Sequence, residues 1–259
     1  MNKQPIGIFD SGVGGTSIWK EIQTLLPHEN MIYLADSINA PYGPKGKEAI
    51  IDLSIKNTEY LIHKGCKLIV VACNTATTNA IDYLRSQYDL PFIGIEPAIK
   101  PAALQSQTHN IGILATKGTL SSELFHKTSH LFANTANILE QEGNGIVELI
   151  ESGNLYSDEM KALLKIYLNP MVESGIDYLV LGCTHYPYLI PLLIELLPKH
   201  IKIIDSGEAV ARHTKAVLEQ NDLLNKTSIL GKTNFFTNGK PKVMASLLGK
   251  THTVSYLKF

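Results

Sequence analysis

The chain contains one sequence pattern twice. Cys73 ends the apolar run LIVVA and is followed by Asn-Thr, and Cys183 ends the run YLVLG and is followed by Thr-His. Two more pairs of segments match in the same order: IGIF at 6–9 with IGIL at 111–114, and FIGIE at 92–96 with IKIID at 201–205. All three matches are offset by a little over a hundred residues, which predicts two similar α/β halves.

Strand-like and helical patterns alternate along the chain. The apolar runs predict strands at 6–9, 31–35, 68–73 and 178–181, and the helical spacing predicts helices at 18–26, 47–63 and 157–172. Gly65 stands where a helix C-cap is expected, and residues 36–47 are rich enough in Pro, Gly and Asn to predict a loop. Continuous apolar strands separated by helices indicate parallel sheets.

Polar segments follow the strands at the point where each strand ends. In open parallel sheets, ligands bind beyond the carboxyl ends of the strands. Each segment also precedes an expected helix start, where free backbone N–H groups favour an anion and lower the pKa of a nearby thiol. We therefore expect an anionic small molecule at three segments: Asp10-Ser11, Cys73-Asn74-Thr75 and Cys183-Thr184-His185.

Composition limits the possible functions. A chain of 259 residues with 44% hydrophobic residues can bury the cores of two domains. Its formal net charge of -1, without a run of Lys or Arg, predicts no nucleic-acid partner and no anionic membrane surface as partner. The N-terminus lacks the apolar region of a signal peptide, and no apolar run is long enough to span a bilayer. Three cysteines fit reduced thiols in a cytoplasmic protein.

Most of these residues also have an ordinary structural interpretation. A buried cysteine usually packs as a small hydrophobe, but the twinned contexts of Cys73 and Cys183 favour chemistry, whereas Cys66 has no twin and is expected to be structural. His185 lies two residues after a thiol, which favours a role over a simple turn position. Asp10 could cap the following helix and also take part in the reaction.

The glycines after the first strand do not form a dinucleotide fingerprint. The segment GVGGTS at residues 12–17 would need Gly where Ser17 stands. A nucleotide cofactor is therefore not expected.

Several motifs, which follow one another along the chain, resemble those of one family. They are GIFDSGVGGT at 7–16, PYG at 41–43, VACNTAT at 71–77, GCTHYPY at 182–188 and DSGE at 205–208. Together they resemble glutamate racemases, members of the cofactor-independent amino-acid racemases, over nearly the whole chain. The pairing of CNTA with GCTH is specific, whereas DSGVGG alone is common. One local departure is that residues 141–152 lack the Cys-Pro often found there in the family.

The resemblance implies a fold and a division into domains. We expect two similar α/β domains, each a mostly parallel sheet flanked by helices, related by pseudo-twofold symmetry with the active site between them. The first domain is expected at 1–97 plus 207–259, and the second at 98–206. The resemblance further implies a homodimer.

The resemblance also implies a mechanism without a cofactor. Cys73 takes the α-proton of D-glutamate, Cys183 takes that of L-glutamate, and the opposite thiol returns a proton to the other face. Asp10 assists Cys73 and His185 assists Cys183. The product D-glutamate serves peptidoglycan synthesis and cell shape. The implied substrate-binding residues are Asp10, Ser11, Tyr42, Gly43, Asn74, Thr75, Thr116, Glu151, Thr184 and His185.

Three alternatives stay open from the sequence. The first is a racemase of the same family that acts on aspartate or another amino acid. The second is a zinc hydrolase that uses Cys73, Cys183, His185 and Asp10, although no close ligand pair of the structural-zinc type is present. The third is a two-lobed amino-acid-binding protein, which the two thiols and the lack of a signal peptide disfavour.

Overall fold

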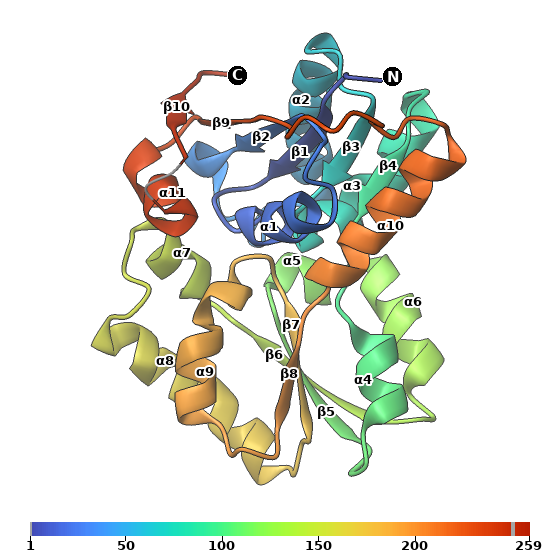
Figure 1. Ribbon diagram of the computed structural model, residues 1–259. Coiled ribbons are helices and arrows are strands. Elements are labelled where there is room, and N and C mark those ends of the chain that lie inside the picture. Colours follow the sequence, from blue (N-terminus) through green and yellow to red (C-terminus); the bar gives the residue numbers. More distant parts are fainter. Residues whose placement is uncertain (1, 250–251) are drawn as a thin grey trace.

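Two parallel β-sheets form the framework of the molecule, one above the other in Figure 1. The structure is a computed structural model that describes residues 2–249 and 252–259. The larger sheet has the strand order β10-β9-β2-β1-β3-β4, and the smaller has the order β6-β5-β7-β8. Every pair of neighbouring strands is parallel. The predicted α/β class with two helix-flanked parallel sheets is confirmed.

The strands are β1 (Ile6–Asp10), β2 (Met31–Ala35), β3 (Leu68–Val71), β4 (Phe92–Gly94), β5 (Asn110–Ala115), β6 (Asn137–Glu142), β7 (Tyr178–Gly182), β8 (Lys202–Ile204), β9 (Thr233–Thr237) and β10 (Val254–Tyr256). The helices are α1 (Thr16–Leu25), η1 (Ser37–Asn39), α2 (Lys47–His63), α3 (Asn74–Gln87), α4 (Ile99–Gln105), α5 (Lys117–Leu120), α6 (Glu123–Phe132), α7 (Ile146–Glu151), α8 (Asp158–Glu173), η2 (Tyr186–Leu189), α9 (Ile190–Leu196), α10 (Gly207–Gln220) and α11 (Pro241–Leu248). None of the helices in the two described ranges is long and apolar enough to cross a membrane.

The sequence repeat corresponds to a repeated sheet. Strands β2-β1-β3-β4 of the larger sheet stand in the same order as β6-β5-β7-β8 of the smaller one. The three matched sequence segments are β1 with β5, β3 with β7, and β4 with β8. The polar segments that follow these strands therefore occupy equivalent places in the two halves.

Both faces of the larger sheet are covered by helices. Ile8 packs into the same apolar cluster as Ile18 and Ile22 of α1, while its neighbour Phe9 packs with Leu61 of α2 on the opposite face. This alternation follows from the period of two in a strand, and continuous burial along β1 means that both faces are apolar. Helices α10 and α11 also contribute to the α1 side, and α3 contributes to the α2 side.

The smaller sheet is covered in the same way. Ile111 and Ile113 of β5 pack with Phe125 of α6 and with residues of α4, whereas Leu181 of β7 packs on the other face with residues of α8 and α9. The chain passes between the two sheets at residues 95–98 and again at 205–206. There Ser206 Oγ donates a hydrogen bond to the carbonyl oxygen of Glu96.

Strands β9 and β10, from the C-terminal part of the chain, extend the larger sheet at the side of β2. This agrees with a first domain that includes the C-terminal segment. The exact bounds of the two domains stay a prediction.

Candidate active site

The carboxyl ends of β1, β3, β5 and β7 bring the polar segments together between the two sheets. β1 ends at Asp10, and Cys73 and Cys183 follow the ends of β3 and β7. Hydrogen bonds cross the junction between the lobes here: the Thr184 hydroxyl donates to Asp10 Oδ2 over 2.8 Å, and the Ser17 hydroxyl donates to the carbonyl oxygen of Thr184 over 2.9 Å. Cys73 and Cys183 are 4% and 7% exposed, so both thiols are shielded from water.

Cys73 occupies the N-cap position of α3. Its Sγ accepts a hydrogen bond from the backbone N–H of Ala76 at 3.4 Å and lies 3.6 Å from Ser11 Oγ. Burial, joined by the negative charge of Asp10, raises the pKa of this thiol to about 12, although the hydrogen bonds from Ala76 and Ser11 act in the opposite direction. At neutral pH Cys73 is therefore a protonated thiol, able to deliver a proton.

Asp10 is fully buried beside Cys73. Its Oδ1 accepts the backbone N–H of Gly12 at 2.6 Å, and its Oδ2 accepts the Thr184 hydroxyl. Burial raises the pKa of Asp10 to about 6, while the charge of His185 and the two hydrogen bonds partly lower it. A carboxyl group that titrates this close to neutrality can exchange protons under physiological conditions. It does not cap α1, whose N-cap is Gly15.

Cys183, His185 and Glu151 form a row of three side chains in contact. His185 Nδ1 lies 3.7 Å from Cys183 Sγ, and His185 Nε2 lies 2.7 Å from Glu151 Oε1. The backbone N–H of Gly14 is also 3.2 Å from Nε2. One ring nitrogen cannot both accept from Gly14 and donate to a carboxylate, and the shorter, charge-assisted contact to Glu151 decides that Nε2 carries a proton. Nδ1 is then the atom that faces the thiol.

The charge of His185 follows from its two partners. Burial alone lowers the pKa of the imidazole, but the hydrogen bonds and negative charges of Cys183 and Glu151 outweigh it and raise the pKa well above its ordinary value of 6.5. An imidazolium at this place stabilises a negative charge on Cys183. The two thiols thus have different surroundings, since Cys73 faces a carboxyl group and Cys183 faces a cation.

The loop between β1 and α1 reaches these groups through its backbone. Gly12 N–H bonds Asp10, and Val13 N–H donates to Glu151 Oε1 over 2.6 Å. A β-carbon at Gly12 would collide with the Glu151 carboxylate, and one at Gly14 would collide with the His185 ring. Glycine is therefore required at these two positions, because the backbone lies close to the Glu151 and His185 side chains.

A second set of contacts joins the lobes on the other side of the thiols. The hydroxyl oxygens of Thr75 and Thr116 are 2.7 Å apart, and Thr119 lies 3.3 Å and 3.2 Å from them. Gly43 borders this cluster, because a β-carbon there would be 3.1 Å from Thr116 Cβ. Hydroxyl groups that bond one another can instead donate to a carboxylate.

Asn74 is buried beside Cys73 with both ends of its amide unused. It is 3% exposed, and neither Oδ1 nor Nδ2 has a hydrogen-bond partner among the residues that the structure describes. Buried amides are normally paired, because leaving one unpaired costs about 1–3 kcal/mol. The unpaired Oδ1 acceptor and Nδ2 donor of Asn74 therefore indicate that a polar ligand binds beside Cys73.

Comparison with known proteins agrees with this geometry. Residues 15–214 match the model of the Asp/Glu/hydantoin racemase family. The chain belongs to this family. The protein is therefore an isomerase, and the resemblance inferred from the sequence motifs is confirmed.

Individual relatives cover the racemase from end to end. It is 43% identical to a glutamate racemase of Herpetosiphon aurantiacus over 247 residues, which are 95% of this chain and 97% of the relative. The crystal structure of a Bacillus anthracis glutamate racemase isoform superposes with a TM-score of 0.89 at 29% identity, covering 100% of this chain and 98% of that one. An Escherichia coli glutamate racemase, in complex with L-glutamate and an activator, matches with a TM-score of 0.85 at 33% identity over 98% of both chains.

Tyr42 lies differently from the other residues that the sequence singled out. Its ring is 1% exposed and packs in the apolar cluster that contains Phe9 and Cys73. Its hydroxyl donates to Asp36 Oδ2 over 2.6 Å and accepts from Asn57 over 3.2 Å. The Tyr42 hydroxyl is thus occupied by protein groups.

Glu151 also has a specific environment. The resemblance implied that Glu151 binds the substrate. In the racemase its carboxylate bonds His185, the Val13 N–H and the Ser37 hydroxyl, the last at 3.0 Å. Its hydrogen-bond partners are therefore protein groups, among them His185.

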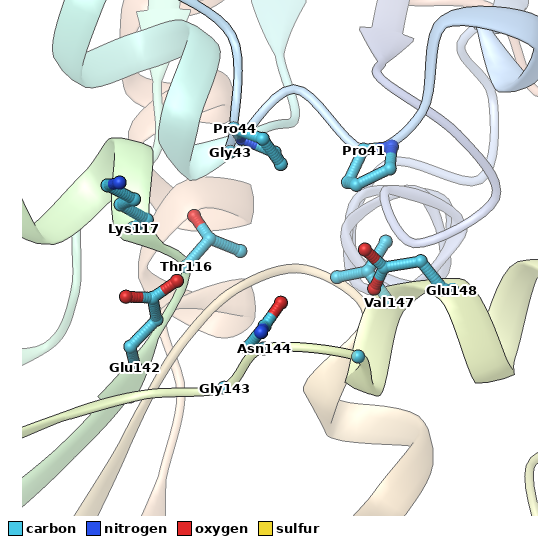
Figure 2. A pocket seen from close by; sticks show the side chains of 11 residues that line it. Pro41, Gly43, Pro44, Thr116, Lys117, Glu142, Gly143, Asn144, Val147 and Glu148 are labelled. Atoms are coloured by element: carbon cyan, nitrogen blue, oxygen red, sulfur yellow. The ribbon is translucent and has the colours of Figure 1, made fainter.

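A recess opens beside the cluster of threonines. Figure 2 shows Pro41, Gly43 and Pro44 on one side of it and Glu142, Gly143 and Asn144 on the other, with Thr116 between them. Gly43 and Thr116 were both predicted to bind substrate. The thiols themselves do not line this recess, so it lies at the outer end of the site.

Cys66 lies apart from this arrangement. It precedes β3 and so stands at the opposite edge of the larger sheet, where a β-carbon at Gly7 would be 3.0 Å from its Sγ. Burial raises its pKa to about 12. A packed, protonated thiol of this kind is inert.

Sequence reasoning missed Tyr33, Asp36 and Ser37 as parts of the site. Asp36 directly follows β2, and the rule that polar residues at strand ends face the ligand could have found it. Tyr33 lies inside a strand and carried no such signal. Within the described ranges, no three side chains of His, Cys, Asp or Glu form a group that could hold a metal ion.

Proposed function

We propose that this racemase interconverts L- and D-glutamate by a two-cysteine mechanism without a cofactor. Support for glutamate comes from the relatives, since the Herpetosiphon protein is named a glutamate racemase and the Escherichia coli structure contains L-glutamate. The observation that carries the mechanism is the pair of buried thiols at equivalent strand ends, each beside a different proton-exchanging group.

The reaction from L-glutamate begins at Cys183. Its thiolate, stabilised by the imidazolium of His185, takes the α-proton, and the electron pair of the C–H bond is delocalised into the α-carboxylate. The Cys73 thiol then gives its proton to the opposite face of Cα. D-glutamate leaves with Cys183 protonated and Cys73 as thiolate, and the reaction from D-glutamate runs through the same steps in reverse. Such positioned proton transfer contributes about 10²- to 10⁴-fold to a rate.

The substrate carboxylates require donors that are already in place. The Asn74 amide and the hydroxyls of Thr75 and Thr116 supply them, together with the backbone at Tyr42 and Gly43. Donors that are fixed before the reaction stabilise the charge that grows on the α-carboxylate as the proton leaves. Ser11 and Thr184 stand beside the two thiols and complete the binding set.

Solvent exchange of the α-hydrogen tests the proposal. Purified protein with reductant and no added cofactor is incubated with L-glutamate in D₂O, and circular dichroism and deuterium at Cα are followed. The optical signal decays to zero and deuterium enters D-glutamate. Replacing Cys73 or Cys183 by Ser lowers the rate by on the order of 10²- to 10⁴-fold. The Cys66→Ser variant is the matched control and keeps the wild-type rate, because that thiol lies at the far edge of the sheet.

The same assay separates the alternatives. Aspartate tested in parallel is expected to be inert, and faster turnover of aspartate than of glutamate would overturn the substrate assignment. No racemisation, together with zinc that metal analysis finds in the purified protein and chelator removes, would favour the zinc hydrolase. Binding of glutamate without any exchange would favour the binding protein. Near-normal racemisation by Cys73→Ser would contradict the two-thiol mechanism.

We further propose that the enzyme works in the cytoplasm and supplies D-glutamate for peptidoglycan. Two free thiols are best preserved in a reducing compartment. The gene is expected to restore growth without D-glutamate to a bacterium that requires this amino acid, and the gene carrying Cys73→Ser is expected to fail. Failure of the wild-type gene, with active protein present, would contradict this role.

A further inference from the structure

Tyr33 lies beneath the loop that contacts the acid and base groups. It is on β2, paired with Ile8 of β1, and its side chain is 0% exposed. Its hydroxyl donates to the carbonyl oxygen of Gly12 over 3.1 Å. The hydroxyl reaches this place because position 15 is a glycine, where a β-carbon would lie 2.8 Å from the hydroxyl oxygen. Burial, followed by the charge of Asp10, raises the Tyr33 pKa well above 10, so the hydroxyl keeps its proton and remains a donor.

The Gly12 carbonyl and the Val13 N–H belong to one peptide unit. In a trans peptide these two groups point in opposite directions, and the unit is planar. A hydrogen bond that holds the carbonyl therefore also fixes the direction of the N–H. The Val13 N–H points at Glu151 Oε1, 2.6 Å away.

This peptide connects Tyr33 to the second thiol. Glu151 Oε1 lies 2.7 Å from His185 Nε2, and His185 Nδ1 lies 3.7 Å from Cys183 Sγ. The contacts run without a gap from a strand of the larger sheet to the thiol of the smaller sheet. Asp10 and Cys73 are outside this row, because Asp10 is bonded by the N–H of Gly12, which belongs to the preceding peptide unit.

We propose that Tyr33 is a positioning residue for racemisation: its hydroxyl orients the Gly12–Val13 peptide so that Glu151 and His185 are held correctly beside Cys183. The proposal rests on the proposed function. It assigns to Tyr33 an effect on proton transfer at Cys183 and none of its own on transfer at Cys73. Tyr33 touches neither the substrate nor a thiol in this role.

The asymmetry can be measured although the overall reaction is symmetric. L- and D-glutamate have equal free energies, so any variant must change kcat/KM equally in the two directions. Isotope effects do distinguish the two transfers. When transfer at Cys183 is slowed, removal of deuterium from L-[2-²H]glutamate becomes more rate-limiting and its isotope effect rises. The isotope effect for D-[2-²H]glutamate falls, because the later transfer at Cys183 then limits that direction.

The test uses Tyr33→Phe, which removes only the hydroxyl. Tyr178→Phe is the matched control, because Tyr178 is also a buried strand tyrosine, 4% exposed, whose hydroxyl is bonded to Gln105 and Lys202. It begins β7, at the edge of the smaller sheet away from the thiols. Both variants are measured for thermal unfolding, for kcat/KM in both directions and for the two isotope effects.

Tyr33→Phe is expected to lower kcat/KM about tenfold in both directions, the effect of losing one buried hydrogen bond. Its isotope effect rises for L-glutamate and falls for D-glutamate, whereas Tyr178→Phe changes neither. In a Glu151→Gln background the Tyr33→Phe change adds little, because both act on the same row of contacts.

Unchanged kcat/KM in Tyr33→Phe, or isotope effects that move in the same direction, would overturn the proposal while leaving the racemase function intact. Full additivity with Glu151→Gln would overturn it as well. A Tyr33→Phe protein without a cooperative unfolding transition would also overturn it, because the hydroxyl would then be required for the fold and not only for orienting the peptide. A wild-type protein without exchange would overturn the proposed function itself, and the role of Tyr33 with it.

Discussion

Asp10 links the stability of the folded protein to pH. Burial raises its pKa from 3.8 to about 6. Between these pH values the folded protein keeps a proton that the unfolded chain has released, so the free energy of unfolding falls as pH rises through this window. Above pH 6 the whole loss is present and amounts to about 3 kcal/mol. The buried Asp10 carboxylate thus destabilises the folded protein at neutral pH.

Replacing Asp10 by Asn removes this titration. The Asp10→Asn variant is expected to gain stability relative to wild type as pH rises from 4 to 7, by up to about 3 kcal/mol, while racemisation falls. Urea unfolding at both pH values measures the difference. A difference that is the same at pH 4 and pH 7 would show that Asp10 has an ordinary pKa in the folded protein.

The residues found from the sequence are those whose signal is local. Cys73, Cys183 and Asp10 each end a recognisable apolar run, and strand direction alone places them at one edge. The hydroxyl of Tyr42 could not be placed, because its partners Asp36 and Asn57 come from other segments. Contacts between distant segments depend on packing, which no local pattern contains.

At the scale of elements, a buried ion pair holds together four segments of the chain at the edge opposite the active site. Lys67 Nζ lies 2.6 Å from Glu29 Oε2 and also donates to the carbonyl oxygens of Asn2 and Leu223. Glu29 Oε1 accepts the backbone N–H of Asn225 at 2.7 Å. The starts of β2 and β3 are thereby joined to the segment that leads from α10 into β9.

Removing only the cation is expected to be costly. Lys67→Met leaves the Glu29 carboxylate buried without its partner and lowers the free energy of unfolding by about 3–5 kcal/mol. Adding Glu29→Gln to the same protein recovers most of the loss. Urea unfolding measures both, and kcat/KM is unchanged because the pair lies at the far edge of the sheet. If the free energy of unfolding falls no more in Lys67→Met than in the double variant, the ion pair does not contribute to stability.

The elements themselves were largely predictable where the pattern was strong. β2 and α2 have the predicted bounds, and α8 begins at Asp158 after Ser157, whose side chain caps it by accepting the N–H of Met160. β6 was missed. Its sequence NILEQE carries the alternating, partly exposed pattern of an edge strand and does not resemble β2, its counterpart in the other half.

On the scale of the whole molecule, one apolar cluster contains residues of both lobes, and polar contacts near the thiols also join them. Tyr188 contributes one such contact, since its hydroxyl oxygen is 2.5 Å from Thr16 Oγ1 of α1. Lys20 Nζ lies 4.9 Å from the centre of the same ring. Because the thiols are buried, we expect substrate to reach them when contacts of this kind separate for a time.

Tyr188→Phe removes the hydroxyl and keeps the ring under Lys20. Losing this hydrogen bond is expected to destabilise the contact between the lobes by about 1 kcal/mol. The fraction of molecules in which the lobes are separated here then rises about fivefold. Hydrogen exchange of backbone amides in residues 183–190 and at the start of α1 measures it. Tyr88→Phe is the control, because the Tyr88 hydroxyl bonds Glu59 within one lobe. Equal exchange in both variants would mean that the hydroxyl does not hold the lobes together.

The loop at Gly12–Gly14 meets the groups that serve both thiols with main-chain atoms alone. Gly12 and Gly14 have no side chain to exchange, and a β-carbon added at either would collide with the Glu151 carboxylate or the His185 ring. For protein engineers who seek a new substrate, we therefore expect substitutions at these two glycines to disturb the site without changing which substrate it binds. Useful diversity lies across the site at the threonine cluster, where hydroxyls can be replaced one at a time.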